Sequence, residues 1–138
     1  MSGGPLLLDT NAAIFLTVTE TLNAAAERVL VDAEESGRPV LLSPITAWEL
    51  GILVSKGRLA LSVPPLQWFQ GLLARGIDLA PLTPDVLVGS SFLVDCTLRD
   101  PADRIIAATA RTFDYTVVTR DRPLLDYAAA GHMRAIAC

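Results

Sequence analysis

The sequence has one histidine, one lysine and two cysteines, and these shortages remove whole classes of mechanism. Because His132 is the only histidine, a pair of catalytic histidines is impossible, and a Ser-His-Asp triad would have to use that residue. One histidine with two distant cysteines does not make a zinc site. No GxxxxGK[ST] segment occurs, which removes the P-loop mode of nucleotide binding. Carboxylates are what remains for catalysis.

Long apolar runs and targeting segments are also missing. No run approaches the ~18 residues that a bilayer-spanning helix needs, and the first residues do not form a signal peptide. The two cysteines, Cys96 and Cys138, stand in no CxxC pattern that would indicate a disulfide framework or a redox motif. We therefore expect a cytoplasmic protein in the reduced state, with no membrane attachment.

The composition is that of a compact globular protein. Of the 138 residues, 51% are hydrophobic and 19% are charged, which predicts one folded domain over residues 1–138. The net charge of −4 argues against a nucleic-acid enzyme, because phosphate binding usually requires an excess of basic residues. Five of the arginines nevertheless crowd one late stretch: Arg99, Arg104, Arg111, Arg120 and Arg122.

Apolar runs alternate with helical patterns along the whole chain. Buried strands are expected at residues 6–8, 40–42, 77–82 and 115–119, with an edge strand at 134–138. Helices are expected over residues 22–36, 44–56, 64–76, 83–95 and 101–113, with a short one ending at 131. This alternation predicts an α/β fold whose mostly parallel sheet is covered by helices on both faces.

Three acids fall at the ends of these elements. Asp9 ends the first strand, Asp121 follows the strand at 115–119, and Asp103 lies in the first turn of the helix before that strand. Ligands of open parallel sheets bind beyond the carboxyl ends of the strands, where these acids would converge. Each also has a structural explanation, because Asp is a preferred N-cap and a first-turn acid is favoured by the helix dipole.

Glu49 favours a common site for these acids over separate capping roles. It is the only acid between Pro44 and Lys56, and its helical neighbours at three and four residues include Ile45 and Ile52. An ionised carboxylate on such an apolar face is costly unless it is paired or binds a metal. The alternative is a glutamate on a narrow solvent edge, paired with Lys56 or an arginine. Four converging carboxylates favour a hard divalent cation and metal-dependent phosphoryl chemistry.

The same residues resemble a known family. The matching segments are Leu-Leu-Leu-Asp9-Thr-Asn, Ser43-Pro-Ile-Thr-Ala-Trp-Glu49-Leu, Asp100-Pro-Ala-Asp103-Arg-Ile-Ile-Ala-Ala and Val118-Thr-Arg-Asp121-Arg. In these segments the chain resembles PIN-domain ribonucleases, and among them the VapC-type toxins of type II toxin–antitoxin pairs. The resemblance implies a single PIN-like nuclease domain, a three-layer α/β/α fold with a five-stranded, mostly parallel sheet.

The resemblance also implies an activity and a site. It implies a Mg²⁺-dependent endoribonuclease, with Mn²⁺ possible, that cuts cellular RNA. Asp9, Glu49, Asp103 and Asp121 match the family's catalytic and metal-binding acids. Further site candidates are polar or basic: Thr119, Thr10 and Asn11 would support the acids, and Arg104, Arg120 and Arg122 would contact substrate phosphate. Many relatives have His in place of Asn11, so no function is assigned to it.

The implied partners are a cognate antitoxin and a second copy of the chain, as a homodimer. The apolar stripe of Trp68, Phe69, Leu72 and Leu73 fits such an interface but fits core packing better, and Trp48 is also expected in the core. Three alternatives stay open. These are a PIN-type RNA-processing nuclease without a toxin role, an inactive PIN-fold binding module, and a phosphatase-like phosphoryl hydrolase. The phosphatase-like alternative requires a second Asp at the position that Asn11 occupies. A phosphate-accepting receiver domain would need a strand-end lysine, whereas Lys56 is expected on a helix.

Overall fold

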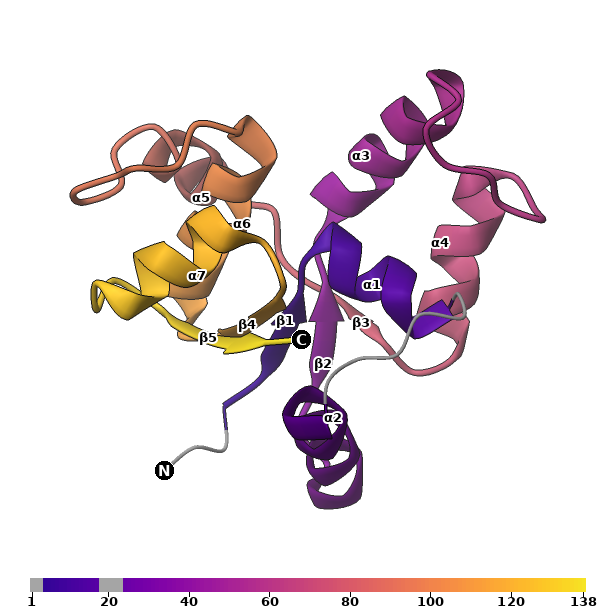
Figure 1. Ribbon diagram of the computed structural model, residues 1–138, viewed down its shortest axis with the longest axis horizontal. Coiled ribbons are helices and arrows are strands. Elements are labelled where there is room, and N and C mark those ends of the chain that lie inside the picture. Colours follow the sequence, from indigo (N-terminus) through magenta and orange to yellow (C-terminus); the bar gives the residue numbers. More distant parts are fainter. Residues whose placement is uncertain (1–3, 18–23) are drawn as a thin grey trace.

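A parallel sheet forms the centre of the computed structural model, which describes residues 4–17 and 24–138 (Figure 1). Its five strands lie in the order β3-β2-β1-β4-β5, and every neighbouring pair is parallel. The strands are β1 Leu6–Leu8, β2 Val40–Leu42, β3 Asp78–Leu79, β4 Thr116–Thr119 and β5 Arg134–Ala137. At the centre, Leu7 lies opposite Leu41 on one side and Val117 on the other.

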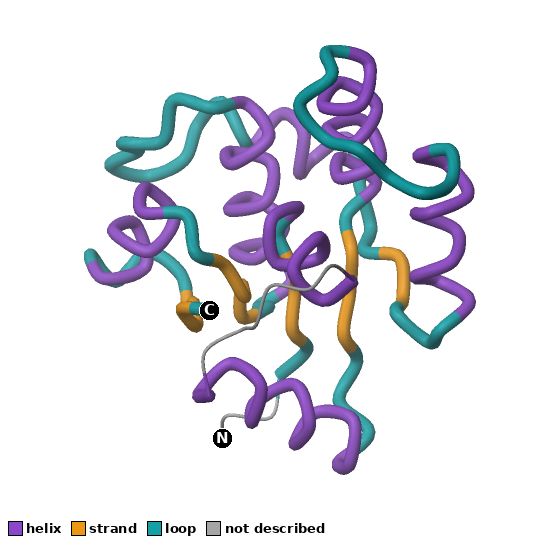
Figure 2. Tube along the Cα trace, turned by 45° about the vertical axis from the view of Figure 1, so that its right-hand side comes forward, coloured by secondary structure: helices purple, strands orange, loops and turns teal. Residues whose placement is uncertain are grey.

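Helices cover both faces of this sheet, as Figures 1 and 2 show. They are α1 Thr10–Thr17, α2 Ala24–Ser36, α3 Pro44–Ser55, α4 Pro65–Ala74, α5 Pro84–Gly89, α6 Pro101–Phe113 and α7 Arg122–Ala129. One core packs Leu6 and Leu8 against α1 to α4, and a second packs Leu7 against α6 and α7. Because successive residues of a strand face opposite sides, the fully buried β1 serves both cores. The expected three-layer α/β/α architecture is confirmed.

Most predicted elements are confirmed near their predicted boundaries, α6 to the residue. The start of the helix predicted over 22–36 lies outside the described residues, and α2 is described from Ala24. The strand predicted over 77–82 is wrong in length, because only Asp78–Leu79 pairs. Ala80 still donates to the Leu42 carbonyl at 2.9 Å, but β2 ends at Leu42 and the chain enters α3, so no strand residues remain for positions 81 and 82 to pair with.

The helix predicted from Thr83 to Asp95 is also too long, since α5 ends at Gly89. The chain then turns, and Asp95 adopts φ 45°, a left-handed conformation that no helix continues through. This segment is held by tertiary contacts instead. The buried Tyr127 donates its hydroxyl proton to the Val94 carbonyl at 2.8 Å, so the chain leaves the helical path to meet α7.

Two predictions of core packing, one for the apolar stripe of α4 and one for Trp48, had different outcomes. Phe69 and Leu72 are buried in the core, with Trp68 and Leu73 packed against it, so core packing is confirmed for the apolar stripe of α4. The prediction that Trp48 is a core residue is wrong, because its side chain is 56% exposed. Glu49 and Leu50 turn inward on the same helix, which leaves the adjacent position 48 facing out.

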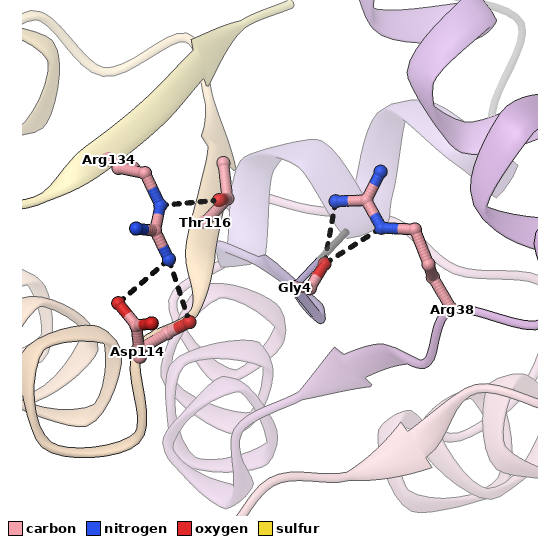
Figure 3. A network of polar contacts seen from close by, with 5 residues as sticks. All are labelled: Gly4, Arg38, Asp114, Thr116 and Arg134. Atoms are coloured by element: carbon pink, nitrogen blue, oxygen red, sulfur yellow. Dashed lines mark hydrogen bonds and ion pairs between the residues drawn. The ribbon is translucent and has the colours of Figure 1, made fainter. Parts of the chain in front are cut away.

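The amino-terminal edge of the sheet is tied by two arginines (Figure 3). Arg38 donates through Nε and Nη2 to the Gly4 carbonyl at 2.9 and 2.6 Å. Arg134 forms a 2.7 Å ion pair with Asp114 and donates to the Thr116 hydroxyl. A cavity of about 670 Å³ opens at this edge, and none of the predicted site residues lines it. Within the described part of the chain, no helix has the length and apolar character to span a membrane.

Candidate active site

The predicted acids sit at the opposite, carboxyl-terminal edge of the sheet. Asp9 follows β1 directly and Asp121 lies two residues beyond β4. Glu49 is in the first half of α3, which starts immediately after β2, and Asp103 is in the first turn of α6. Parallel strands end at one edge, so elements that are far apart in the sequence bring these carboxylates into one region.

Asp9 is held by both of its oxygens. Oδ1 accepts a hydrogen bond from the Ala12 backbone N–H at 2.8 Å, and Oδ2 accepts a short hydrogen bond from the Thr119 hydroxyl. Thr119 is fully buried, and its oxygen also accepts from the Asp121 N–H at 2.9 Å. Thr119 therefore links the two acids, which supports the auxiliary role expected for it.

The capping interpretation of Asp9 and Asp121 is confirmed, and it leaves their predicted role in the site open. Asp121 is the N-cap of α7 and accepts from the Leu124 N–H at 3.3 Å, while Asp9 accepts at the start of α1. A carboxylate has two oxygens and about four acceptor sites, so a cap hydrogen bond leaves acceptor capacity for a ligand. Capping fixes these carboxylates in place and does not exclude a role in the site.

Glu49 is fixed by a relay of hydroxyls. The Thr10 hydroxyl donates a short hydrogen bond to Glu49 Oε1 and lies 3.0 Å from the Thr46 hydroxyl. Because the Thr10 hydroxyl has one proton, Thr46 donates in the second contact. Thr10 thus holds the Glu49 side chain, and its supporting role in the site stays a prediction. Thr46 is buried and holds the Thr10 hydroxyl, a role that was not predicted from the sequence. A lone threonine in an apolar helix is usually interpreted as a core residue.

The charges of these acids are mutually unfavourable. Burial raises the pKa of Asp9, against hydrogen bonds from Thr119 and Ala12 that lower it, and the charge of Asp121 raises it further. Burial also raises the pKa of Glu49, while the Thr10 hydrogen bond lowers it. Asp9 and Glu49 therefore lie within electrostatic reach of Asp121, in a setting that disfavours the ionised forms of Asp9 and Glu49.

Asp103 is the most strongly affected. Burial, followed by the charges of Asp121, Asp100, Glu49 and Asp9, raises its pKa from 3.8 to about 8. The metal-free protein would therefore hold a proton on this carboxyl at neutral pH. A half-buried acid with so high a pKa, surrounded by other acids at the end of a sheet, is typical of a functional site.

Asp100 is a fifth acid of this region, and it was not among the predicted site residues. It is the N-cap of α6, with Oδ1 accepting from the Ala102 N–H at 2.8 Å. Its charge also raises the pKa of both Glu49 and Asp103. The available signal was the position of Asp100 three residues before Asp103, since the N-cap and the third helical residue are neighbours on the first turn.

The remaining candidates lie in different settings. Arg104 donates from Nε to the Leu98 carbonyl at 2.8 Å, and Arg122 lies 3.8 Å from Asp126 on the exposed side of α7. Arg120 places its guanidinium over the ring of Phe15, 4.1 Å from the centroid. Asn11 is exposed on α1.

Oxygen donors of this kind suit a hard divalent cation. Over residues 4–17 and 24–138, no group of three or more His, Cys, Asp or Glu side chains is arranged to hold a metal ion as it stands. The chemistry of the set nevertheless fits, because a cation would favour the ionised forms that burial and repulsion disfavour. The assignment of Asp9, Glu49, Asp103 and Asp121 as ligands stays a prediction.

Comparisons with known proteins agree with this architecture. The family model of the PIN domain matches residues 6–130. The chain is 32% identical over 120 residues to Ribonuclease VapC22 of Mycobacterium tuberculosis, covering 86% of this chain and 88% of that protein.

Solved structures share the fold. VapBC2 from Rickettsia felis, bound to a DNA fragment from its promoter, superposes with a TM-score of 0.68 at 15% identity, covering 96% of this chain and 98% of that one. DNA-bound VapBC from Salmonella typhimurium gives a TM-score of 0.64 at 20% identity, covering 97% and 98%. The family resemblance of the sequence motifs is therefore confirmed: this chain belongs to the PIN domain family.

Proposed function

We propose that this protein is a divalent-metal-dependent endoribonuclease and the toxin of a type II toxin–antitoxin pair. The observation that carries the proposal is the similarity over 86% of the chain to a relative named as a ribonuclease of VapC type. The acids that interact at the carboxyl-terminal end of the sheet support it, because metal-dependent phosphodiester cleavage requires a group of carboxylates that can hold the cation.

The four predicted acids would hold Mg²⁺, or Mn²⁺, beside the scissile phosphate. When bound, such a cation supplies charge neutralisation at the phosphate and lowers the pKa of an attacking water. Asp9 and Asp103 are proposed as the main ligands, with Glu49 and Asp121 completing the site. The buried hydroxyls of Thr119 and Thr10 keep Asp9 and Glu49 in place.

The chain's residues disfavour a metal-independent route. RNA cleavage through the 2′-hydroxyl generally uses a general base and a general acid, and histidine serves most often. His132 is the only histidine, and its ring packs at a tilt against Tyr127, with a centroid distance of 4.8 Å, beyond α7 and away from the acid cluster. We therefore expect hydrolysis by water, with products that lack a 2′,3′-cyclic phosphate.

The proposed setting follows from the same assignment. We propose that residues 1–138 are a single nuclease domain, that the protein acts in the cytoplasm as a homodimer, and that a cognate antitoxin restrains it. Solved relatives named VapBC are complexes with a partner protein and DNA, which makes an antitoxin the expected partner here.

Cleavage of RNA by the purified protein tests the enzymatic part. We expect Mg²⁺ or Mn²⁺ to support cleavage of total cellular RNA, and EDTA or the substitution Asp9→Asn to abolish it. Asp126→Asn is the matched control, because Asp126 is an exposed acid on α7. Equal cleavage in EDTA would exclude the metal mechanism. Hydrolysis of p-nitrophenyl phosphate without RNA cleavage would indicate the phosphatase alternative.

Expression in bacterial cells tests the toxin part. We expect growth arrest by the wild-type chain, relief by co-expression of the small open reading frame beside its gene, and no arrest by Asp9→Asn. If active protein accumulates without affecting growth, the chain is an RNA-processing nuclease and not a toxin.

A further inference from the structure

Thr46 is linked to the acid cluster through one intermediate hydroxyl. Its own hydroxyl lies 3.0 Å from that of Thr10, and Thr10 donates a short hydrogen bond to Oε1 of Glu49. Resting on the ribonuclease function proposed above, we infer that Thr46 is a positioning residue of the metal site. It fixes Glu49 relative to Asp9, and so makes the site selective for Mg²⁺ over Ca²⁺.

The two threonines connect the elements that carry Asp9 and Glu49. Thr10 is the first residue of α1 and follows Asp9 directly. Thr46 and Glu49 are three residues apart on α3, so their side chains lie on the same face of that helix. α1 and α3 contact each other at the carboxyl-terminal edge of the sheet (Figure 1). Thr10 therefore meets α3 at two side chains, and these contacts restrain the separation of Asp9 from Glu49.

The direction of both hydrogen bonds follows from the protons available. The Thr10 hydroxyl donates its one proton to Glu49, so Thr46 supplies the proton in the contact between the two hydroxyls. Thr46 is fully buried and Thr10 is only 6% exposed, so water has little access to replace a missing donor. With Thr46 donating, the Thr10 proton is directed at Glu49. Without that donor, the Thr10 hydroxyl and the Glu49 side chain gain other rotamers.

Glu49 needs this restraint because other acids surround it. Burial raises the pKa of Glu49, and the hydrogen bond from Thr10 lowers it. The charges that raise this pKa further are those of Asp100, Asp9 and Asp121. An ionised Glu49 is therefore repelled by its neighbours, and the hydrogen bond from Thr10 opposes its displacement.

A restrained set of acids discriminates between cations. Mg²⁺ requires near-ideal octahedral geometry, whereas the larger Ca²⁺ accepts flexible arrangements of oxygen ligands. Acids held at a fixed separation can suit the smaller ion, whereas acids that move suit Ca²⁺ better. Loss of the Thr46 hydroxyl should therefore weaken Mg²⁺ binding far more than Ca²⁺ binding.

Displacement of bound Mn²⁺ by Mg²⁺ or by Ca²⁺, followed by electron paramagnetic resonance of the free ion, measures both affinities without RNA. We expect Thr46→Val, which keeps the shape of the side chain but removes the hydroxyl, to weaken Mg²⁺ binding about tenfold and Ca²⁺ binding less than about twofold. Thr46→Ser should restore the wild-type Mg²⁺ affinity. In a Thr10→Val background, Thr46→Val should add almost nothing, because the hydroxyl through which it acts is absent.

The matched control is Thr109→Val, which should keep the wild-type Mg²⁺ affinity. Thr109 is fully buried on α6, and its hydroxyl donates to the Ile105 carbonyl at 2.7 Å. Urea unfolding in EDTA tests the hydroxyl contact in the metal-free protein. Thr10→Val and Thr46→Val should each lower the equilibrium constant for folding about 5–10-fold, and the double variant should lose less than the product of the two.

An unchanged Mg²⁺ affinity of Thr46→Val would overturn the positioning role, as would an equal loss in Thr109→Val. Equal losses of Mg²⁺ and Ca²⁺ affinity would overturn the selectivity. Cleavage of total cellular RNA by the same proteins separates this inference from the proposed function. A wild type whose Mg²⁺ affinity depends on Thr46 but which leaves RNA intact would contradict only the nuclease proposal. Cleavage of RNA with a Mg²⁺ affinity that is independent of Thr46 would contradict only the positioning role.

Discussion

Replacing Asp103 by Asn should stabilise the metal-free protein, although it removes a proposed catalytic residue. The pKa of Asp103 is raised from 3.8 to about 8, so ionisation of this carboxyl opposes folding. At ~1.4 kcal/mol for each pH unit, this displacement sets a ceiling of roughly 6 kcal/mol. Water and salt reach the half-buried side chain and screen its charge, so we expect a gain of about 2 kcal/mol at pH 8.

The pH dependence of this gain has a definite sign. Between pH 3.8 and about 8 the folded state keeps a proton on Asp103 that the unfolded chain has released. The free energy of unfolding of the metal-free wild type should therefore fall as pH rises through this window. Asp103→Asn lacks this dependence, so its advantage should be below ~1 kcal/mol at pH 5 and largest at pH 8.

Thermal and urea unfolding in EDTA measure this gain. For a chain of this length, about 2 kcal/mol corresponds to a rise in Tm of roughly 6–10 °C. Asp126→Asn is the control, because its exposed ion pair with Arg122 contributes at most ~1 kcal/mol. Saturating Mg²⁺ should reverse the order, since it stabilises the wild type and not the variant. A Tm of Asp103→Asn equal to or below that of the wild type in EDTA at pH 8 would show that ionisation of Asp103 does not oppose folding.

Three further predictions concern individual side chains. Thr119→Val leaves Asp9 without its hydroxyl donor, and should cost about 1–3 kcal/mol in urea unfolding and most of the cleavage activity, whereas Thr119→Ser should retain both. Asp100→Ser keeps an N-cap oxygen but removes a charge, so the Tm should be unchanged or higher. The Mg²⁺ concentration for half-maximal cleavage should shift, and an unchanged Mg²⁺ requirement would place Asp100 outside the site. Trp48→Ala should cost less than ~1 kcal/mol and Leu50→Ala about 2–5 kcal/mol, because Trp48 is 56% exposed and Leu50 is fully buried; similar costs would contradict this packing.

The sheet and its helices could be predicted from the sequence where local propensity and tertiary packing favour the same structure. Leu6–Leu8 is apolar at every position and is buried on both faces, as a central parallel strand must be. Asp100 and Pro101 mark the start of α6 by capping and by a ring that suits the first turn. The irregular course of the chain after α5 could not be predicted from the sequence, because it includes a tertiary hydrogen bond from Tyr127 to the Val94 carbonyl.

The site was only partly readable for the same reason. The sequence pattern of an aspartate after a strand is the same whether the side chain caps a helix, lies in a cluster of acids or does both. Asp9 does both. Asp100 was not predicted as a site residue, because its proximity to Glu49 depends on the tertiary placement of α3 and α6. Trp48 was wrongly predicted to be a core residue, because a large apolar side chain suggests burial. Whether its face of the helix is covered depends on the tertiary fold.

Binding of Mn²⁺, followed by the loss of the free-ion signal in electron paramagnetic resonance, tests most directly whether the acid cluster is a metal site. We expect saturable binding by the wild type and by Asp126→Asn, and at least a tenfold weaker affinity for Asp9→Asn and for Asp103→Asn. Equal Mn²⁺ affinity in all four proteins would contradict it.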